Sequence, residues 1–255
     1  RPHRAHNPRE AEMKLIQTSI IFDRGEIAKT AGWRSTYEAY AATILEMVNP
    51  PGNDCFAIRK KTRKLDENGK KTSQWNRNGV GPIKRQFHRH MAGRGWIPEA
   101  PLDLSPYFQS EKVPPYLLYP SLEEQSISED VSVGDFDFWF RTEDGTRTAI
   151  EWETGNISSS HRSVNKLCMA LSAGLIDAAV LIVPSRVTYP HLTDRIGNWN
   201  ELRPYIAFWQ TYGRSLQRGL LAMTVWEHDQ LADDDSIPYI KAGLDGRSAE
   251  GLARL

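Results

Sequence analysis

Hydrophobic and polar positions alternate most clearly between residues 134 and 183, and this stretch predicts the centre of the fold. Two apolar-rich segments, Gly134–Phe140 and Arg147–Gly155, flank a short polar turn and have the pattern of a β-hairpin. A helical pattern follows from Ser158, and the run Ala178–Val183 is typical of a buried strand. Two paired strands, a crossover helix and a further strand predict an α/β fold with a mixed central sheet.

The crossover helix has recognisable ends. Ser158–Ser160 offer hydroxyl side chains for an N-cap, and Gly174 suits the left-handed residue that follows a helix. Its predicted apolar stripe consists of Val164, Leu167, Cys168 and Leu171.

Periodicity and helix-breaking residues predict further elements elsewhere. Helical spacing relates four early positions, Ala11, Leu15, Ile16 and Ser19. A helix is predicted over Ser35–Val48, because Ser35 and Glu38 form a capping box and the prolines after Asn49 stop it. The other predicted elements are a hairpin of Phe56–Lys64 with Lys70–Gln74, a helix from Pro82 to about Met91, a short helix from Asn200 and a strand over Gly219–Trp226.

The length of 255 residues suits one large domain or two small ones and supports ample core, and residues 1–255 are interpreted as a single domain. Residues 1–10 are polar, which is typical of a flexible terminus. Residues 104–132 contain several prolines, serines and acids and are interpreted as an inserted loop with one helical turn. Such a long connection suits a packed surface excursion or a lid.

Carboxylates recur at two-residue intervals in both segments of the predicted hairpin. Glu151 and Glu153 share one face of their strand. Asp135 and Asp137 do the same in the preceding strand. If the turn comprises the three residues 143–145, Asp137 lies directly opposite Glu151. Such a cluster destabilises a fold unless a cation lies between the carboxylates. The alternative is an ordinary hairpin whose acidic side chains face solvent.

Charge distribution and cysteine content narrow the functional classes. The chain has 32 basic and 32 acidic residues, so net charge indicates no polyanionic partner. Residues 56–96, however, contain twelve basic and two acidic residues, a pattern that suits nucleic-acid binding or a solvated surface. Cys55 and Cys168 lack metal-ligand or disulfide spacing, which fits the cytoplasm. No apolar run approaches the roughly 20 residues of a membrane-spanning helix.

Several longer runs carry a family resemblance. The run EWETGNISSSHRSVNKL (151–167) resembles the corresponding segment of the BamHI-type restriction endonucleases. Further similar runs are NGVGPIK (78–84), PEAPLD (98–103), GLIDAAVLIVP (174–184), LTDR (192–195), NELRPY (200–205) and IPYIKAGLDGRS (237–248). The resemblance covers most of residues 78–248 with one interruption. It implies a restriction-endonuclease-like fold, a mixed sheet flanked by helices, in the ExE variant of the PD-(D/E)xK nuclease superfamily.

The resemblance implies a catalytic set of carboxylates. Asp137, Glu151 and Glu153 would bind Mg²⁺ for phosphodiester hydrolysis. Glu153 stands where many related nucleases have a lysine, and it would ligate the metal or accept a proton from water. Glu99 matches a further acidic residue of the family site. Asp135 competes with Asp137 as first metal ligand, and Asp137 is preferred because its flanking pattern, Gly-x-apolar-Asp-apolar, matches the family.

The resemblance also implies residues that bind double-stranded DNA. Positions that contact bases in the family correspond to Asn156, Ser158, Arg162, Asp194 and Arg195. Lys84 is a candidate phosphate contact, and Asp245 matches a residue near the minor groove. Ordinary alternatives are helix capping for Ser158, an exposed helix arginine for Arg162, an ion pair for residues 194–195 and a solvated side chain for Lys84. The family's basic helix after Asp245 is replaced here by SAEGLARL, which leaves that role open.

These implications define one main functional hypothesis. The chain would be a type II, Mg²⁺-dependent endonuclease that cleaves GGATCC, or a close palindrome with a GATC centre, and leaves four-base 5′ overhangs. A palindromic site implies a homodimer, for which the predicted helices over 164–175 and near 200–205 are candidate interfaces. The alternatives are a catalytically inactive DNA-binding protein of the same fold and a glycosidase with paired carboxylates.

Overall fold

A computed structural model describes residues 13–108, 113–126, 133–193, 195–233 and 235–241. Its centre is a six-stranded sheet with the order β1-β11-β10-β9-β8-β5. The strands are β1 (Lys14–Arg24), β5 (Ile97–Ala100), β8 (Phe136–Arg141), β9 (Arg147–Trp152), β10 (Ala178–Pro184) and β11 (Gly219–Glu227). β9, β10 and β11 are parallel, whereas the other pairings are antiparallel. The mixed central sheet predicted from the sequence is confirmed.

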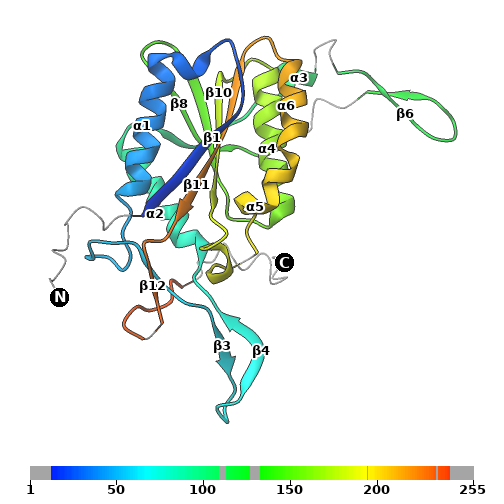
Figure 1. The fold of residues 1–255 in the computed structure, drawn as a ribbon. Helices are drawn as coiled ribbons and strands as arrows, with labels where there is room; N and C mark the ends of the chain where they lie inside the picture. Colours follow the sequence, from blue (N-terminus) through cyan, green and yellow to red (C-terminus); the bar gives the residue numbers. More distant parts are fainter. Residues whose placement is uncertain (1–12, 109–112, 127–132, 194, 234, 242–255) are drawn as a thin grey trace.

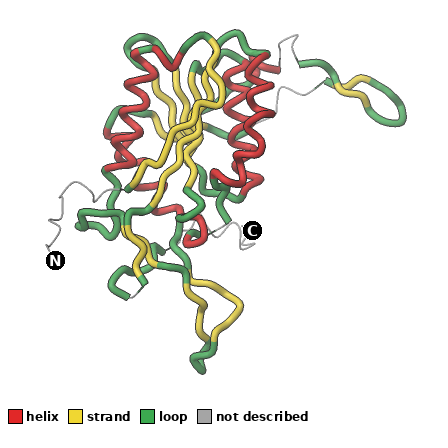
Figure 2. Tube along the Cα trace, viewed as in Figure 1, coloured by secondary structure: helices red, strands yellow, loops and turns green. Residues whose placement is uncertain are grey.

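Helices cover both faces of this sheet (Figures 1 and 2). One layer contains α1 (Ala31–Leu45) and α2 (Val80–Gly93), and the other contains α4 (Ile157–Ser172) and α6 (Ile206–Arg214). Alternate residues of β10 enter the two cores: Val180 and Ile182 join the α1/α2 core, and Ala179 and Leu181 join the α4/α6 core. Because β10 is buried on both faces, its sequence is a continuous apolar run. No helix within the described residues combines the length and apolar character of a membrane span.

Shorter elements surround the two layers. They are β2 (Ala57–Arg59) paired with β12 (Gln230–Ala232), β3 (Thr62–Leu65) with β4 (Lys71–Asn76), β6 (Tyr116–Leu117) with β7 (Glu124–Gln125), α3 (Ser105–Phe108), α5 (Trp199–Leu202), and the 3₁₀ turns η1 (Ile27–Lys29), η2 (Tyr189–His191) and η3 (Arg203–Tyr205). The hairpin predicted over residues 56–74 is confirmed in its outer part. Between residues 104 and 132, α3 supplies the expected helical turn, and β6 and β7 form a hairpin that projects from the body (Figure 1).

Two predictions near the N-terminus are wrong. Residues from Lys14 onwards form a strand and not a helix, because β1 pairs with β11, a partner about 200 residues away that local spacing cannot reveal. The helix predicted from Ser35 begins at Ala31, where the Thr30 Oγ1 atom accepts a hydrogen bond from Trp33 N at 3.1 Å. The prediction of a flexible segment over residues 1–10 lies outside the described residues.

The turn between β8 and β9 has the predicted length. Thr142 N donates to Thr146 O at 2.9 Å, which leaves three residues in the turn, and Phe138 lies opposite Ile150. Asp144 fixes the turn, because its Oδ1 accepts hydrogen bonds from Thr142 Oγ1 at 2.6 Å and Thr146 N at 3.0 Å. The predicted register is therefore confirmed.

The same turn docks on the start of α1. Asp144 Oδ2 accepts a hydrogen bond from Gly32 N at 2.7 Å. A Cβ atom at position 32 would collide with the Asp144 carboxylate, so this close approach requires glycine. The carboxylate also lies near the positive end of the helix, and its hydrogen bonds hold the pKa of Asp144 well below the usual range.

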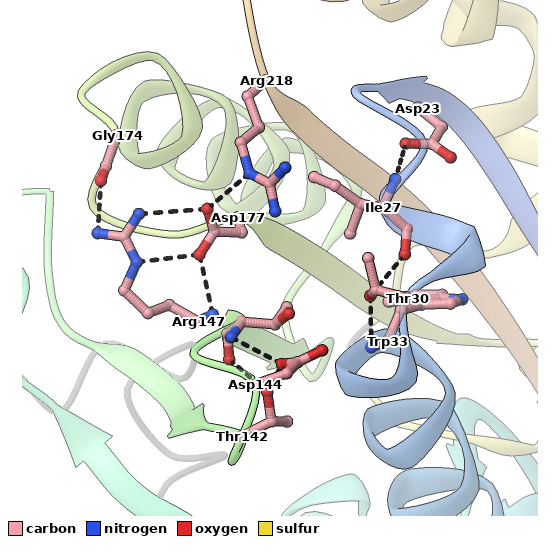
Figure 3. Close-up of polar contacts among 11 residues, drawn as sticks. Asp23, Ile27, Thr30, Trp33, Thr142, Asp144, Arg147, Gly174, Asp177 and Arg218 are labelled. Atoms are coloured by element: carbon pink, nitrogen blue, oxygen red, sulfur yellow. Dashed lines mark hydrogen bonds and ion pairs between the residues drawn. The ribbon is translucent and has the colours of Figure 1, made fainter.

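Asp177 joins three strands at this end of the sheet (Figure 3). Its Oδ2 accepts hydrogen bonds from Arg147 N and Nε, both at 3.0 Å, and its Oδ1 accepts one from Arg218 Nε at 3.2 Å. Arg147 Nη1 also donates to Gly174 O at 2.6 Å, beyond the C-terminus of α4. Burial alone would raise the pKa of Asp177, but the bonds from Arg147 and Arg218 outweigh it and lower the pKa.

We predict that Asp177→Asn lowers the free energy of unfolding at pH 7 by about 1–3 kcal/mol, because a buried charge-assisted network loses its anion. The folded-state pKa of Asp177 is depressed, so its stabilisation is present above the unfolded-state pKa of about 4 and is lost as the pH falls below it. Urea unfolding of parent and variant between pH 3 and pH 7 measures both effects, and the difference should shrink toward low pH.

Glu26→Gln is the matched control, since Glu26 pairs with Lys29 on the surface and both side chains are more than 70% exposed. Its unfolding should resemble that of the parent at every pH. Equal stability of the parent and Asp177→Asn at pH 7 would contradict the proposed contribution of the network.

Candidate active site

A cavity of about 280 Å³ lies where β9 ends and α4 begins. Its charged lining residues are Asp135, Asp137, Glu151, Glu153, Lys84, Arg162 and Lys166. The fold thus brings together all the carboxylates of the predicted hairpin pattern. Asp137, Glu151 and Glu153 are buried, whereas Asp135 is exposed.

Asp137 lies at the point where β8 and β9 separate. The ladder between the two strands ends with Phe138 opposite Ile150. Beyond this pair, the side chain of Asp137 takes over the role of the main chain: its Oδ2 atom accepts a hydrogen bond from Trp152 N of the neighbouring strand at 2.8 Å. The Oδ1 atom accepts one from Lys84 Nζ at 2.6 Å, and Lys84 belongs to α2. Both carboxylate oxygens are therefore oriented by the fold.

Glu151 is held from the opposite helical layer. Its Oε1 lies 2.8 Å from the Nζ atom of Lys166 on α4 and 3.3 Å from Asp137 N. Lys166 Nζ also donates to Asp135 O. Burial raises the pKa of Glu151, the neighbouring Asp137 charge raises it further, and Lys166 opposes both effects. A lysine from each helical layer thus neutralises part of the carboxylate cluster.

Glu153 has an unpartnered oxygen. Its Oε1 accepts a hydrogen bond from Gly155 N at 2.6 Å, but its buried Oε2 has no hydrogen-bond partner among the described residues. Burial raises the pKa of Glu153 to about 7, although the Gly155 N–H lowers it. Because an orphaned buried oxygen is costly, Glu153 Oε2 marks a position where a ligand or proton would be stabilised.

Glu99 lies beside Asp137, together with His88. Ligand atoms of His88, Glu99 and Asp137 all lie within 4.8 Å of one another. The side chain of Glu99 is 68% exposed and its φ is 47°, whereas His88 Nε2 is buried without a hydrogen-bond partner in the described chain. Burial and the charge of Lys84 lower the pKa of His88, which favours the neutral imidazole that binds metals.

The donor set fits a divalent cation. Carboxylate oxygens are the ligands that hard cations such as Mg²⁺ prefer. Three buried carboxylates converge here, and two of the buried polar atoms around Asp137 lack partners among the described residues. Lys84 and Lys166 offset only part of the negative charge of the carboxylates. The remaining negative charge would attract a cation to the cluster.

The predicted base-contacting residues of α4 lie at its first two turns. Asn156, and not Ser158–Ser160, is the N-cap: its Oδ1 accepts hydrogen bonds from Ser158 N at 3.0 Å and Ser159 N at 3.2 Å. Ser158 and Arg162 are exposed, and Arg162 lines the cavity. The prediction for the helix N-cap is therefore wrong, because the longer Asn156 side chain reaches the free N–H groups from one position before the helix.

The second predicted base-contacting loop lies against the same helix. Asn156 forms a β-bridge with Ile196, and Gly197 N donates to Gly155 O at 3.3 Å. This contact brings exposed Arg195, whose φ is 48°, to the start of α4. Asp194 and Asp245 lie outside the described residues. Lys84, a predicted phosphate contact, donates a hydrogen bond to Asp137 inside the cluster.

The sequence analysis did not predict two residues of the cluster, Lys166 and His88. Lys166 follows Arg162 by four positions, so both lie on one face of α4. Only the structure shows that Lys166 is buried, with 8% of its surface exposed, and is therefore not an ordinary solvated lysine. His88 likewise follows Lys84 by four positions on α2. This four-residue spacing from predicted site residues was the available signal.

Comparison with known proteins identifies relatives of the whole chain. The sequence profile of the family described as restriction endonuclease BamHI matches residues 13–247. The type II restriction enzyme OkrAI of Oceanobacter kriegii is 37% identical over 236 residues, 92% of this chain and 99% of the relative. The type II restriction enzyme BamHI of Bacillus amyloliquefaciens is 31% identical over 242 residues, 94% and 95% of the two chains.

Among solved structures, the restriction endonuclease BglII complexed with a DNA 16-mer has a TM-score of 0.49 and 10% identity, with 87% of this chain and 80% of that chain covered. The family match and the two relatives extend over nearly the full chain, so the chain belongs to the BamHI restriction endonuclease family and is a type II restriction enzyme that cleaves DNA at specific sites.

Proposed function

We propose that this endonuclease uses Mg²⁺ to cleave both strands of GGATCC, or of a close palindrome with a GATC centre, and leaves four-base 5′ overhangs. The buried cluster of Asp137, Glu151 and Glu153 beside the start of α4 is the observation that carries the proposal. A cytoplasmic location is part of it, because both cysteines, Cys55 and Cys168, are free thiols.

Asp137 and Glu151 would hold the cation, and Glu153, His88 and Glu99 would offer further ligand atoms. When bound, Mg²⁺ supplies a polarised water and counter-charge for the phosphate. Lys84 and Lys166 orient the carboxylates before binding, through the 2.6 Å and 2.8 Å contacts described above. The chain thus contributes preorganised oxygen ligands in a buried cavity, where electrostatic interactions are stronger than in water.

Glu153 is the best candidate to accept a proton from the attacking water. Its Oε2 is buried without a partner among the described residues, and its pKa of about 7 is close to that of an effective general base at neutral pH. The Gly155 N–H holds the other oxygen and so directs Oε2. A side chain on Gly155 would crowd Ser159 and approach Glu153 Oε1 to 3.2 Å, which explains the glycine.

Base reading would fall to the residues at the start of α4 and the neighbouring loop. Arg162 and Arg195 are exposed arginines of the kind that bind guanine bidentately. The Oδ1 atom of Asn156 already accepts the two capping bonds, so in this arrangement only its amide nitrogen remains to contact a base. A bidentate contact of Asn156 with adenine would therefore require the cap to rearrange when DNA binds.

A palindromic target supports a homodimer. The apolar stripe of α4 is buried against the sheet of the same chain, so this face of the helix is not available to a partner. The other candidate region fits better. Tyr205 of η3 is 47% exposed and Phe208 of α6 is 68% exposed, and both have the character of interface aromatics.

We predict that Glu151→Gln reduces cleavage of plasmid DNA at least about 100-fold, because it removes a charged metal ligand. The amide retains the size of the side chain and can still accept a bond from Lys166, whereas alanine would leave a buried lysine unpaired. Single-turnover cleavage with Mg²⁺ measures the loss, and gel-shift assays with Ca²⁺ should detect site-specific binding close to that of the parent.

Glu143→Gln, in the exposed β8–β9 turn, is the matched control and should cleave at the parent rate. Thermal unfolding establishes that both variants are folded. Cleavage by Glu151→Gln at a rate near the parent's would refute the assignment of this carboxylate to the metal.

The target sequence gives a separate prediction. Digestion of DNA of known sequence with Mg²⁺ should produce ends that all map to GGATCC or a palindrome with a GATC centre, cut before the second G. Each correct bidentate contact discriminates by about 1–3 kcal/mol, so sites with one changed base should be cleaved at least about fivefold more slowly. Ends that map to sites without GATC would show that the readout residues specify another sequence.

For the dimer, we predict that Phe208→Asp is monomeric in sedimentation velocity at concentrations where the parent is dimeric, because a charge would be buried at the interface. Ile97→Asp is the control: Ile97 is 49% exposed but belongs to β5, at the other edge of the sheet. Dimers of unchanged stability in the Phe208 variant would place the interface elsewhere.

A further inference from the structure

The hairpin formed by β3 and β4, residues 62–76, contributes nothing to the cavity described above. We propose that this hairpin, the basic arm, binds DNA phosphates outside the sequence that the enzyme recognises. The partner is the duplex that flanks the cleavage site, and the contact is independent of its base sequence.

The basic arm concentrates positive charge in a chain whose net charge is zero. The basic arm contains four basic residues, and the residues at its root raise this to eight basic and two acidic over 59–77, so the rest of the chain is net acidic. One of the two acids, Asp66, is engaged in the turn, where its Oδ1 accepts hydrogen bonds from Asn68 N at 3.0 Å and Lys70 N at 2.8 Å. The arm therefore attracts a polyanion to one part of an otherwise acidic surface.

Most of this charge is not neutralised within the protein. Arg59 and Lys60, at the root of the hairpin, pair with Asp235 and Asp233. Among the residues that the structure describes, no carboxylate lies within ion-pair distance of the other six, which are Lys61, Arg63, Lys64, Lys70, Lys71 and Arg77. All but Lys61 and Arg77 are exposed. Repulsion among these neighbouring cations is relieved when an anionic partner binds.

Trp75 orders two of the free cations. The Arg63 guanidinium carbon lies 3.9 Å from the centroid of the Trp75 ring, and Lys61 Nζ lies 5.1 Å from it. Arg63 Nη1 also donates to Ser73 O at 2.7 Å. These contacts restrict the side chains before DNA arrives, which reduces the entropy lost on binding.

The root of the basic arm is fixed to the loop that precedes Arg195. Lys61 N donates to His191 Nδ1 at 3.1 Å, and Asn78 N donates to His191 O at 2.8 Å. Thr193 N donates in turn to Asn78 O at 2.9 Å. The arm and the predicted base-reading loop are therefore joined by one hydrogen-bonded framework.

Direction and length both suit flanking DNA. In Figure 1 the arm extends from the end of the sheet at which β9, β10 and β11 end, the end that carries the carboxylate cluster. β4 has six residues, about 20 Å at ~3.3 Å each, which corresponds to about six base pairs of duplex. The proposed target has six base pairs, of which each subunit would read three. An arm that spans about six base pairs is therefore long enough to extend beyond the target, and this estimate rests on the proposed function.

The test is the triple variant Lys64→Gln/Lys70→Gln/Lys71→Gln, which removes exposed charges and leaves the Arg63–Trp75 stack intact. Binding is measured in EDTA to two duplexes centred on the enzyme's own mapped cleavage site, one of about 30 and one of about 10 base pairs. Three lost phosphate contacts should reduce the slope of log K against log salt by about 2–3 on the longer duplex. Affinity for it should fall at least about tenfold, with less than about a twofold change on the shorter duplex.

Two matched variants separate charge from structure. Lys64→Arg/Lys70→Arg/Lys71→Arg should restore the parent slope. Lys29→Gln/Arg34→Gln/Arg214→Gln removes three exposed basic residues at the opposite end of the sheet and should leave binding unchanged. Circular dichroism melting of each variant checks that the hairpin substitutions do not unfold the protein.

Parent-like slope and affinity of the glutamine variant on the longer duplex would overturn the proposal. So would an equal loss on both duplexes, because that result would place the hairpin on the recognition sequence itself. The ends mapped after plasmid digestion should be identical for parent and variant. The target sequence and the basic arm are therefore tested by separate measurements.

Discussion

The burial of three carboxylates at one end of the sheet is the constraint on which the rest of this structure depends. Glu151 and Glu153 are each 5% exposed and Asp137 is 9% exposed, and uncompensated charges in such surroundings cost several kcal/mol each. Lys84 on α2 and Lys166 on α4 offset part of that cost. Because one lysine comes from each helical layer, the electrostatics of the cluster also hold both layers in position on the sheet.

The opposite end of the sheet provides the rigidity that this cluster requires. Asp144 closes the β8–β9 turn and docks it on α1, and Asp177 connects the starts of β9, β10 and β11. The length of that turn sets the register of the hairpin, and the register places Asp137 next to Glu151. A polar network far from the chemistry thus determines which carboxylates can meet.

In the proposed function, recognition and cleavage share one short segment of chain. Glu151 belongs to β9, and Glu153 follows that strand directly. Asn156 then caps α4, and Arg162 lies in the second turn of this helix. A displacement of α4 on binding DNA would therefore reach the carboxylates through Lys166. Under the proposed function, this coupling would make correct base contacts and an assembled metal site depend on each other.

The sequence by itself determined the β8–β9 hairpin, its register, the stripe of the crossover helix and the buried strand β10, because turn length and the periods of strands and helices are local properties. Its long similar runs also indicated the family. Only the tertiary structure decided that residues from Lys14 form an edge strand, that α1 begins at Ala31, and that Lys166 and His88 join the carboxylates. The pairing of β1 and the contacts of Lys166 and His88 depend on partners far away in the chain, which come together only when the helices pack on the sheet. Four-residue spacing on α4 and α2 marks a shared helix face, but it does not show that this face meets the carboxylates.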